Sequence, residues 1–172
     1  MTATSVLGAE KPERTGSRKK GGPDIIERVL AFVRWTGVAL FILGAVDLGL
    51  TWLPTQFGNR EWEFATVTAS FNGMPVILIG LMFVLAAAAL EGRRWWALGV
   101  GVVGLACLVC VLGGTVLWAT NIPLAMGAVE GATMTVMKKA IFKTTMQSVI
   151  LPVIFGLVAF NGFKVFRTTQ KS

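Results

Sequence analysis

Asp47 is the residue of this sequence with the clearest capacity for chemistry, because it lies in the apolar segment 29–53. An intramembrane carboxylate costs a few kcal/mol on insertion scales unless it finds a partner or water, so it is a functional hypothesis by default. Thr115, Lys143 and Gln147 are predicted at a similar depth in other segments. One interpretation is a proton- or cation-coupled transport site. The favoured one is a buried carboxylate that ties its helix to Lys143 or Gln147.

Arg34 is the other charged residue of the same segment, and Trp35 follows it. Its long side chain can extend to the lipid headgroups at the inner membrane surface. Asn161, in the last apolar segment, is predicted at a comparable depth and is the expected hydrogen-bond partner. Cys107 and Cys110 lie mid-segment on one helical face. Reactive thiolates need an electropositive, partly wet setting, so these two are interpreted as packing residues.

Several classes of chemistry are excluded by what the sequence lacks. It contains no histidine, which removes His-ligated haem, His-containing zinc or copper sites and His-based proton transfer. It also shows no phosphate-binding loop, catalytic triad or paired catalytic carboxylates. We therefore expect no enzymatic activity, no metal site and no cofactor, although a lipid or pigment could be held between the helices.

The composition indicates a membrane protein. Of 172 residues, 54% are hydrophobic and 15% are charged, against roughly 25% charged in soluble domains. A hydrocarbon core of about 30 Å takes around 20 apolar residues per helix. The predicted fold is all-α, with four transmembrane helices in an antiparallel bundle. A tail at 1–24 and a tail at 168–172 enclose a transmembrane domain at 25–167, whose spans are about 30–53, 74–90, 96–119 and 144–163.

The charge distribution predicts the topology and the partners. Most of the sixteen Lys and Arg residues, in a chain of net charge +7, flank spans on one proposed side. This is the positive-inside pattern, which places both termini in the cytoplasm of a bacterial cell. Membrane lipids and other membrane protein subunits are the expected partners, and nucleic acid is not.

Two outer connections have hydrophobic residues at helical spacing and predict two short interfacial helices. The first carries Phe64, Val67 and Phe71, and the second carries Met134, Met137 and Ile141. Tryptophan is favoured at membrane surfaces. The predicted interfacial anchors are Trp35, Trp52, Trp62, Trp95, Trp96 and Trp118.

Glycines are dense within the predicted spans. Small residues allow helices to approach closely, either inside one chain or between subunits. The candidates for a helix-packing or docking face are Gly37, Gly44, Gly99 and Gly104.

A resemblance to a known family rests on a short set of residues, namely Asn59-Arg60-x-Trp62, then Pro75, Gly80 and Leu81. Over residues 48–85 the sequence resembles the J-type small polytopic membrane proteins associated with hormogonium polysaccharide biosynthesis in cyanobacteria. The resemblance implies a membrane component of polysaccharide export or envelope biogenesis, and it supplies no catalytic residues.

The leading functional prediction is a non-catalytic accessory or scaffold subunit of a larger membrane complex. It depends on the missing catalytic groups and on the small residues and aromatic belts of the spans. The alternatives are a small oligomeric transporter that uses Asp47 and the polysaccharide-export role.

Overall fold

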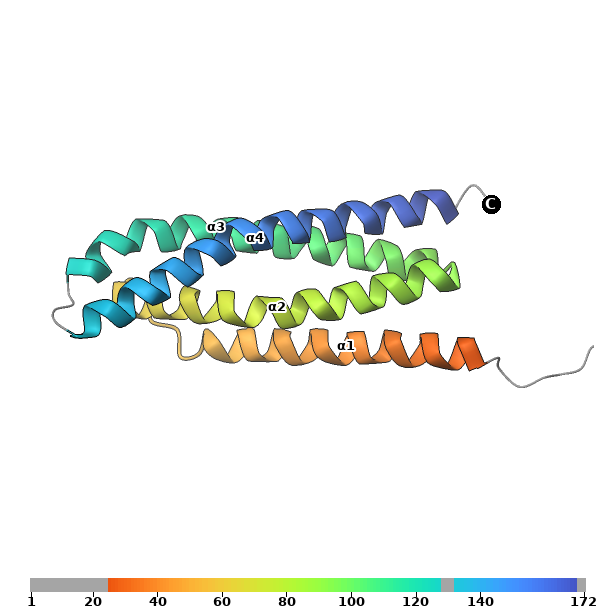
Figure 1. The fold of residues 1–172 in the computed structure, drawn as a ribbon, viewed down its shortest axis with the longest axis horizontal. Helices are drawn as coiled ribbons and strands as arrows, with labels where there is room; N and C mark the ends of the chain where they lie inside the picture. Colours follow the sequence, from red (N-terminus) through yellow and green to blue (C-terminus); the bar gives the residue numbers. More distant parts are fainter. Residues whose placement is uncertain (1–24, 128–131, 170–172) are drawn as a thin grey trace, which may run out of the picture.

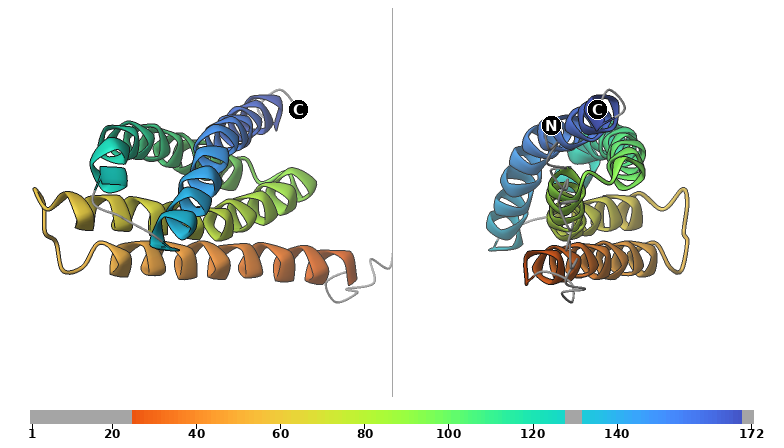
Figure 2. Two further views of the ribbon diagram at one scale, coloured as in Figure 1. Left: turned by 60° about the vertical axis from the view of Figure 1, so that its left-hand side comes forward. Right: turned by 90° about the vertical axis from the view of Figure 1, so that its right-hand side faces the viewer.

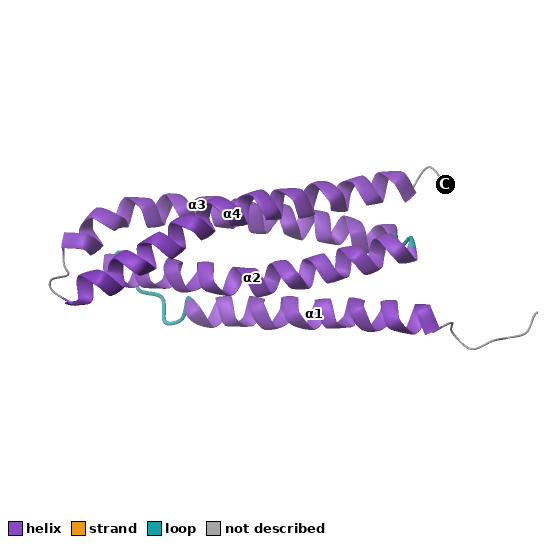
Figure 3. Ribbon diagram, in the orientation of Figure 1, coloured by secondary structure: helices purple, strands orange, loops and turns teal. Residues whose placement is uncertain are grey.

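The computed structural model describes residues 25–127 and 132–169, and all secondary structure in them is α-helical (Figures 1 and 3). The elements are α1 (Ile25–Thr51), α2 (Arg60–Glu91), α3 (Arg94–Gly127) and α4 (Ala132–Thr169). Each helix is long and apolar enough to cross a membrane. The predicted tail at 1–24 lies outside the described residues. Of the predicted tail at 168–172, the first two residues belong to α4 and the rest lie outside.

Helix α2 is the central element. It packs against all three other helices, whereas α3 and α4 pack against each other. Within the described residues the close backbone approaches of α1 are all to α2, and Figure 2 shows α1 set apart from α3 and α4. The core therefore lies between α2, α3 and α4, and its least exposed large residues are Val67, Val111 and Phe155.

The helices begin and end where the local sequence gives caps. The side chain of Asn59 accepts hydrogen bonds from the backbone N–H groups of Glu61 and Trp62, which satisfies two free donors at the start of α2. At the other end Gly92 has φ 68°, a left-handed conformation that glycine adopts at little cost. The α2–α3 turn is consequently short.

The segments predicted as interfacial helices are continuous with the longer helices. Residues 60–73 form the first turns of α2, which begins well before the predicted span at 74, and Pro75 lies inside the helix. The second segment is likewise the start of α4. Pro75 lies at this junction, but membrane helices tolerate proline because neighbouring helices and local adjustments satisfy the freed backbone groups, so one helix forms. At 32 to 38 residues, α2, α3 and α4 are about 48–57 Å long and exceed the membrane core.

Glycine determines where the helices cross. A Cβ atom on Gly37 would lie 2.7 Å from the carbonyl oxygen of Gly80, and one on Gly162 would lie 2.7 Å from the backbone nitrogen of Gly101. The first contact joins α1 to α2, and the second joins α3 to α4. Both are too close for any larger residue without a shift of the helices.

Candidate functional site

The strongest polar interaction lies at the end of the molecule that carries the α2–α3 turn. Glu91, the last residue of α2, accepts a hydrogen bond from Arg34 of α1 and forms an ion pair with Arg93 of the turn. The Arg93 Nε to Glu91 Oε2 distance is 2.8 Å. The side chains of Arg34 and Glu91 are only 8% and 12% exposed, so this pair is largely desolvated. Arg34 Nε is buried without a hydrogen-bond partner.

Aromatic rings complete the surroundings of Arg34. Its guanidinium carbon lies 5.4 Å from the ring centroid of Trp96 and 6.0 Å from that of Trp35, within the range of cation–π attraction. The predicted partner was wrong, because Asn161 is exposed on α4 and donates to the Leu157 carbonyl. Arg34 and Asn161 lie at a similar predicted depth in the membrane, but the helices that carry them, α1 and α4, do not approach each other.

Asp47 is exposed on the surface of α1. Its Oδ2 atom lies 3.2 Å from the position of a Cβ on Gly73, so the carboxylate sits beside α2 where glycine leaves room. Apart from the backbone bonds of α1, the one hydrogen bond at Asp47 within the described residues is from the Thr51 hydroxyl to its backbone carbonyl. Among the described residues, the Asp47 carboxylate has no ion pair and no hydrogen bond.

The predicted companions of Asp47 do not gather around it. Lys143 is exposed on α4. Thr115 donates to the Val111 carbonyl within α3, and Gln147 Oε1 is buried without a partner. The idea that Asp47 holds its helix to Lys143 or Gln147 is therefore wrong. The carboxylate lies instead at an exposed position beside Gly73 of α2.

The opposite end of the molecule holds an aromatic cluster. The ring of Trp62 lies 5.9 Å from that of Trp52 and 5.6 Å from that of Phe57, both close to edge-to-face. Trp52 Nε1 donates to Ser70 Oγ at 3.0 Å. These contacts join the end of α1 to the start of α2.

The prediction of an interfacial anchor is wrong for one of the six tryptophans, Trp118. Trp118 is 3% exposed and stacks on Phe64 in the core, with its ring nitrogen unpaired. Thr68 Oγ1 and Gln147 Oε1 are also buried without partners, so α2, α3 and α4 each contribute one such atom. Buried water commonly satisfies groups of this kind.

The predicted glycine face is mostly used inside the chain. A Cβ on Gly44 would lie 2.6 Å from Ile77, and one on Gly104 would lie 3.3 Å from the Ala159 nitrogen. Together with Gly37 they pack α1 on α2 and α3 on α4, and they are not free for a partner subunit. Gly99 alone has open space beside it.

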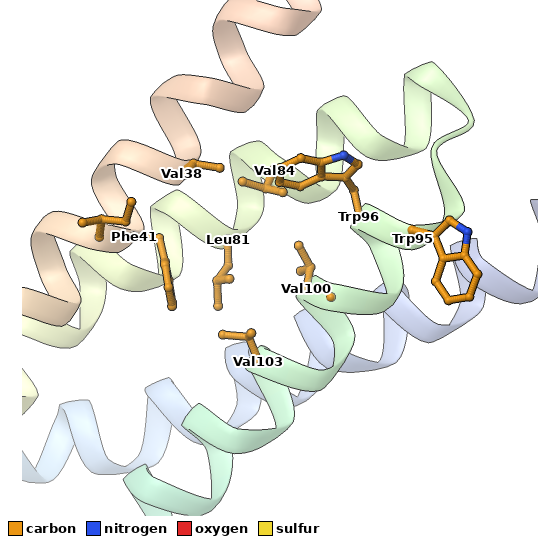
Figure 4. Close-up of a pocket in the computed structure, with 10 residues that line it drawn as sticks. Val38, Phe41, Leu81, Val84, Trp95, Trp96, Val100 and Val103 are labelled. Atoms are coloured by element: carbon orange, nitrogen blue, oxygen red, sulfur yellow. The ribbon is translucent and has the colours of Figure 1, made fainter.

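Gly99 lines the larger of two apolar cavities between α1 and α3, with α2 as their floor (Figure 4). This cavity measures about 500 Å³ and includes Val38, Phe41, Leu81 and Val103. A smaller cavity of about 170 Å³ lies nearer Trp52, and Cys110 is among its lining residues. The two thiols are free, and no cluster of three metal-binding side chains occurs in the residues that the structure describes.

The fold and these sites have the character of a membrane protein, with four helices that are long and apolar enough to cross a bilayer. Comparison with known proteins gave no matching family model, no similar curated protein and no similar solved structure. The resemblance to the polysaccharide-associated family accordingly stays a prediction.

Proposed function

We propose that this chain is a non-catalytic integral membrane protein that serves as an accessory subunit of a larger membrane complex. The observation that carries the proposal is the exposed carboxylate of Asp47 within the apolar helix α1. The chain folds without using this charge. A charged side chain that faces lipid is costly, and such groups usually face protein or water. A cation or hydrogen-bond donor on a neighbouring subunit would remove that cost.

The distribution of the other polar groups supports an accessory role over transport. The strongest ion pair, between Arg34 and Glu91, joins α1 to α2 and is consumed in the fold. Thr115, Lys143 and Gln147 do not converge with Asp47 on a common site. A coupled transporter needs such convergence to hold and release its ion, so the transport hypothesis lacks structural support in the described residues.

In this proposal the chain lies in the bacterial cytoplasmic membrane, with the α2–α3 turn and both termini on the cytoplasmic side. Arg93 and Arg94 of that turn supply the positive charge expected there. The successive helices alternate in direction (Figure 1), which fits an antiparallel arrangement across one bilayer. The aromatic cluster around Trp52 would then lie near the outer surface.

The proposal predicts that Asp47→Asn releases the chain from its complex. Loss of one partner from a buried charge pair costs about 2 kcal/mol or more, which corresponds to roughly 30-fold weaker association. The measurement is gentle detergent extraction followed by native electrophoresis and mass spectrometry of the band that contains this chain. The isolated subunit should keep its thermal stability, because its own fold does not use the Asp47 carboxylate.

Glu61→Gln is the matched control, since it removes another exposed carboxylate at the start of α2. This variant should remain in the complex. Retention of Asp47→Asn in a large complex would show that Asp47 does not hold a partner. Migration of the unaltered chain alone, as a small homo-oligomer, would refute the accessory role itself.

A further inference from the structure

The two apolar cavities follow one another along the space between α1 and α3, and the two together are called the groove. On α1 the lining residues Val38, Phe41, Leu48 and Trp52 follow helical spacing from one cavity into the other. The lining residues of α2 and α3 continue in the same way. The groove exists because the backbone of α1 comes close only to that of α2, while α1 reaches α3 through side chains such as Arg34 on Trp96.

The groove changes character at its inner end. Figure 4 shows Trp96 lying across this end, with the side chains of Val38, Phe41, Leu81 and Val100 directed into the space between the helices. The guanidinium of Arg34 lies 5.4 Å from the Trp96 ring centroid. The apolar groove therefore ends at the Trp96 ring, beside the cationic guanidinium of Arg34.

Positive charge exceeds negative charge at this end. Glu91 is one carboxylate between two guanidinium groups, those of Arg34 and Arg93. The Arg93 side chain is 57% exposed, so its remaining N–H groups can reach a ligand. A further cavity of about 610 Å³ adjoins these groups and is lined by Arg28, Arg34 and Arg93 together with Glu27 and Glu91.

We propose that the groove binds an acyl chain of an anionic phospholipid and that Arg93 binds its phosphate. Arg34 and Glu91 act as positioning residues, because Glu91 pairs both with Arg93 and with Arg34, and Arg34 lies beside Trp96 of the groove. Arginine suits phosphate recognition since its planar N–H groups match the phosphate oxygens.

The size of the groove favours a lipid chain over a partner helix. A transmembrane helix about 10 Å wide that crosses a 30 Å core occupies roughly 2,000 Å³. The inner and outer cavities are about 500 Å³ and about 170 Å³. An extended acyl chain is much narrower than a helix and can lie between the lining side chains.

The acyl-chain site is tested by filling it. Gly99→Phe places a ring in open space within the groove, and Gly113→Phe is the matched control, because Gly113 also has open space but does not line either cavity. The protein is reconstituted in nanodiscs of mixed phosphatidylglycerol and phosphatidylcholine, re-extracted in mild detergent, and its retained phospholipid is quantified by mass spectrometry. We expect about one phosphatidylglycerol per chain for the unaltered protein and for Gly113→Phe, and at least a tenfold loss for Gly99→Phe.

The headgroup contact is tested with Arg93→Gln, which changes an exposed side chain and leaves the core intact. The probe is phosphatidylglycerol with brominated acyl chains, which quenches tryptophan fluorescence at close range, and the part of the quenching that a Trp96→Phe variant lacks is assigned to Trp96. One basic residue near a membrane surface contributes about fivefold to anionic-lipid binding, so Arg93→Gln should need about fivefold more of this lipid for half-maximal quenching. Arg60→Gln, at the far end of α2, should leave the quenching curve unchanged.

If Gly99→Phe retains as much phosphatidylglycerol as the unaltered protein, the acyl-chain site is refuted. This conclusion holds even if the same variant releases a protein from the native complex. Equal quenching by brominated phosphatidylcholine and brominated phosphatidylglycerol would overturn the phosphate contact. Neither outcome depends on whether the chain has a partner subunit.

Discussion

Glu91→Leu is expected to destabilise the protein by about 3–5 kcal/mol, because it leaves the buried guanidinium of Arg34 without its carboxylate. Among the described residues no other acid pairs with Arg34, and Trp96 offers only a cation–π contact. Loss of an acceptor for a buried charge is among the most costly single changes known in folded proteins. The measurement is thermal unfolding in a mild detergent, followed by near-ultraviolet circular dichroism.

The geometry predicts that the two halves of this pair are not equivalent. Arg34→Leu leaves Glu91 with Arg93 at 2.8 Å, so its cost is smaller, about 1.5–3 kcal/mol for one charged hydrogen bond. The double variant Arg34→Leu/Glu91→Leu removes both buried charges and should be more stable than Glu91→Leu alone. Equal losses in the two single variants, or a double variant that loses the sum of both, would refute the coupling.

The helices could be predicted from the sequence, but their ends could not. Hydropathy identifies the part of a helix that meets lipid: three of the four predicted spans lie wholly within helices of the structure, and the first, 30–53, runs two residues past the end of α1 at Thr51. Hydropathy does not report how far a helix continues into water. In α2 the decisive residue is Asn59, whose side chain caps the helix about four turns before the apolar run. The position of Asn59 directly before an amphipathic stretch is the sequence feature that indicates this early start of α2.

The partner of Arg34 could not be found by matching depth alone. Asn161 and Glu91 both lie near the inner ends of their spans, but only Glu91 is on a helix adjacent to α1. The neighbour of each helix is decided by packing, which depends on glycine contacts between particular residues. The α1–α2 hairpin indicates the correct partner. Its two helices run antiparallel and are linked by the hydrogen bond from Trp52 to Ser70, which brings Arg34 to the level of Glu91.

Asp47 shows a different limit of sequence reasoning. An acidic residue in an apolar segment marks a site of interest, but the sequence does not say whether the chain itself or another molecule neutralises it. The side of α1 on which Asp47 lies is determined by Gly37 and Gly44, which face α2. Asp47 follows Gly44 by three residues, so it lies at the edge of the side that meets α2, beside Gly73, and it remains exposed there.

Gly162→Ala is expected to destabilise the α3–α4 pair by about 1–3 kcal/mol, although it adds a single methyl group. The new Cβ would lie 2.7 Å from the Gly101 nitrogen and 2.8 Å from the Ala97 carbonyl oxygen. These are backbone atoms, so no side chain can rotate away, and the helices must separate along the contact. The loss of dispersion contacts on either side adds to the cost.

Gly113→Ala is the matched control for this prediction, since it adds the same methyl group to α3 where nothing lies within 4 Å. Alanine favours the helix over glycine by about 1 kcal/mol, so this variant should unfold at the same temperature as the unaltered protein or slightly higher. Gly104→Ala should fall between the two, because its Cβ would be 3.3 Å from the Ala159 nitrogen and a small shift relieves it. The order Gly162, Gly104, Gly113 in unfolding temperature, lowest first, follows from these distances, and any other order would mean that α3 and α4 do not cross at Gly162.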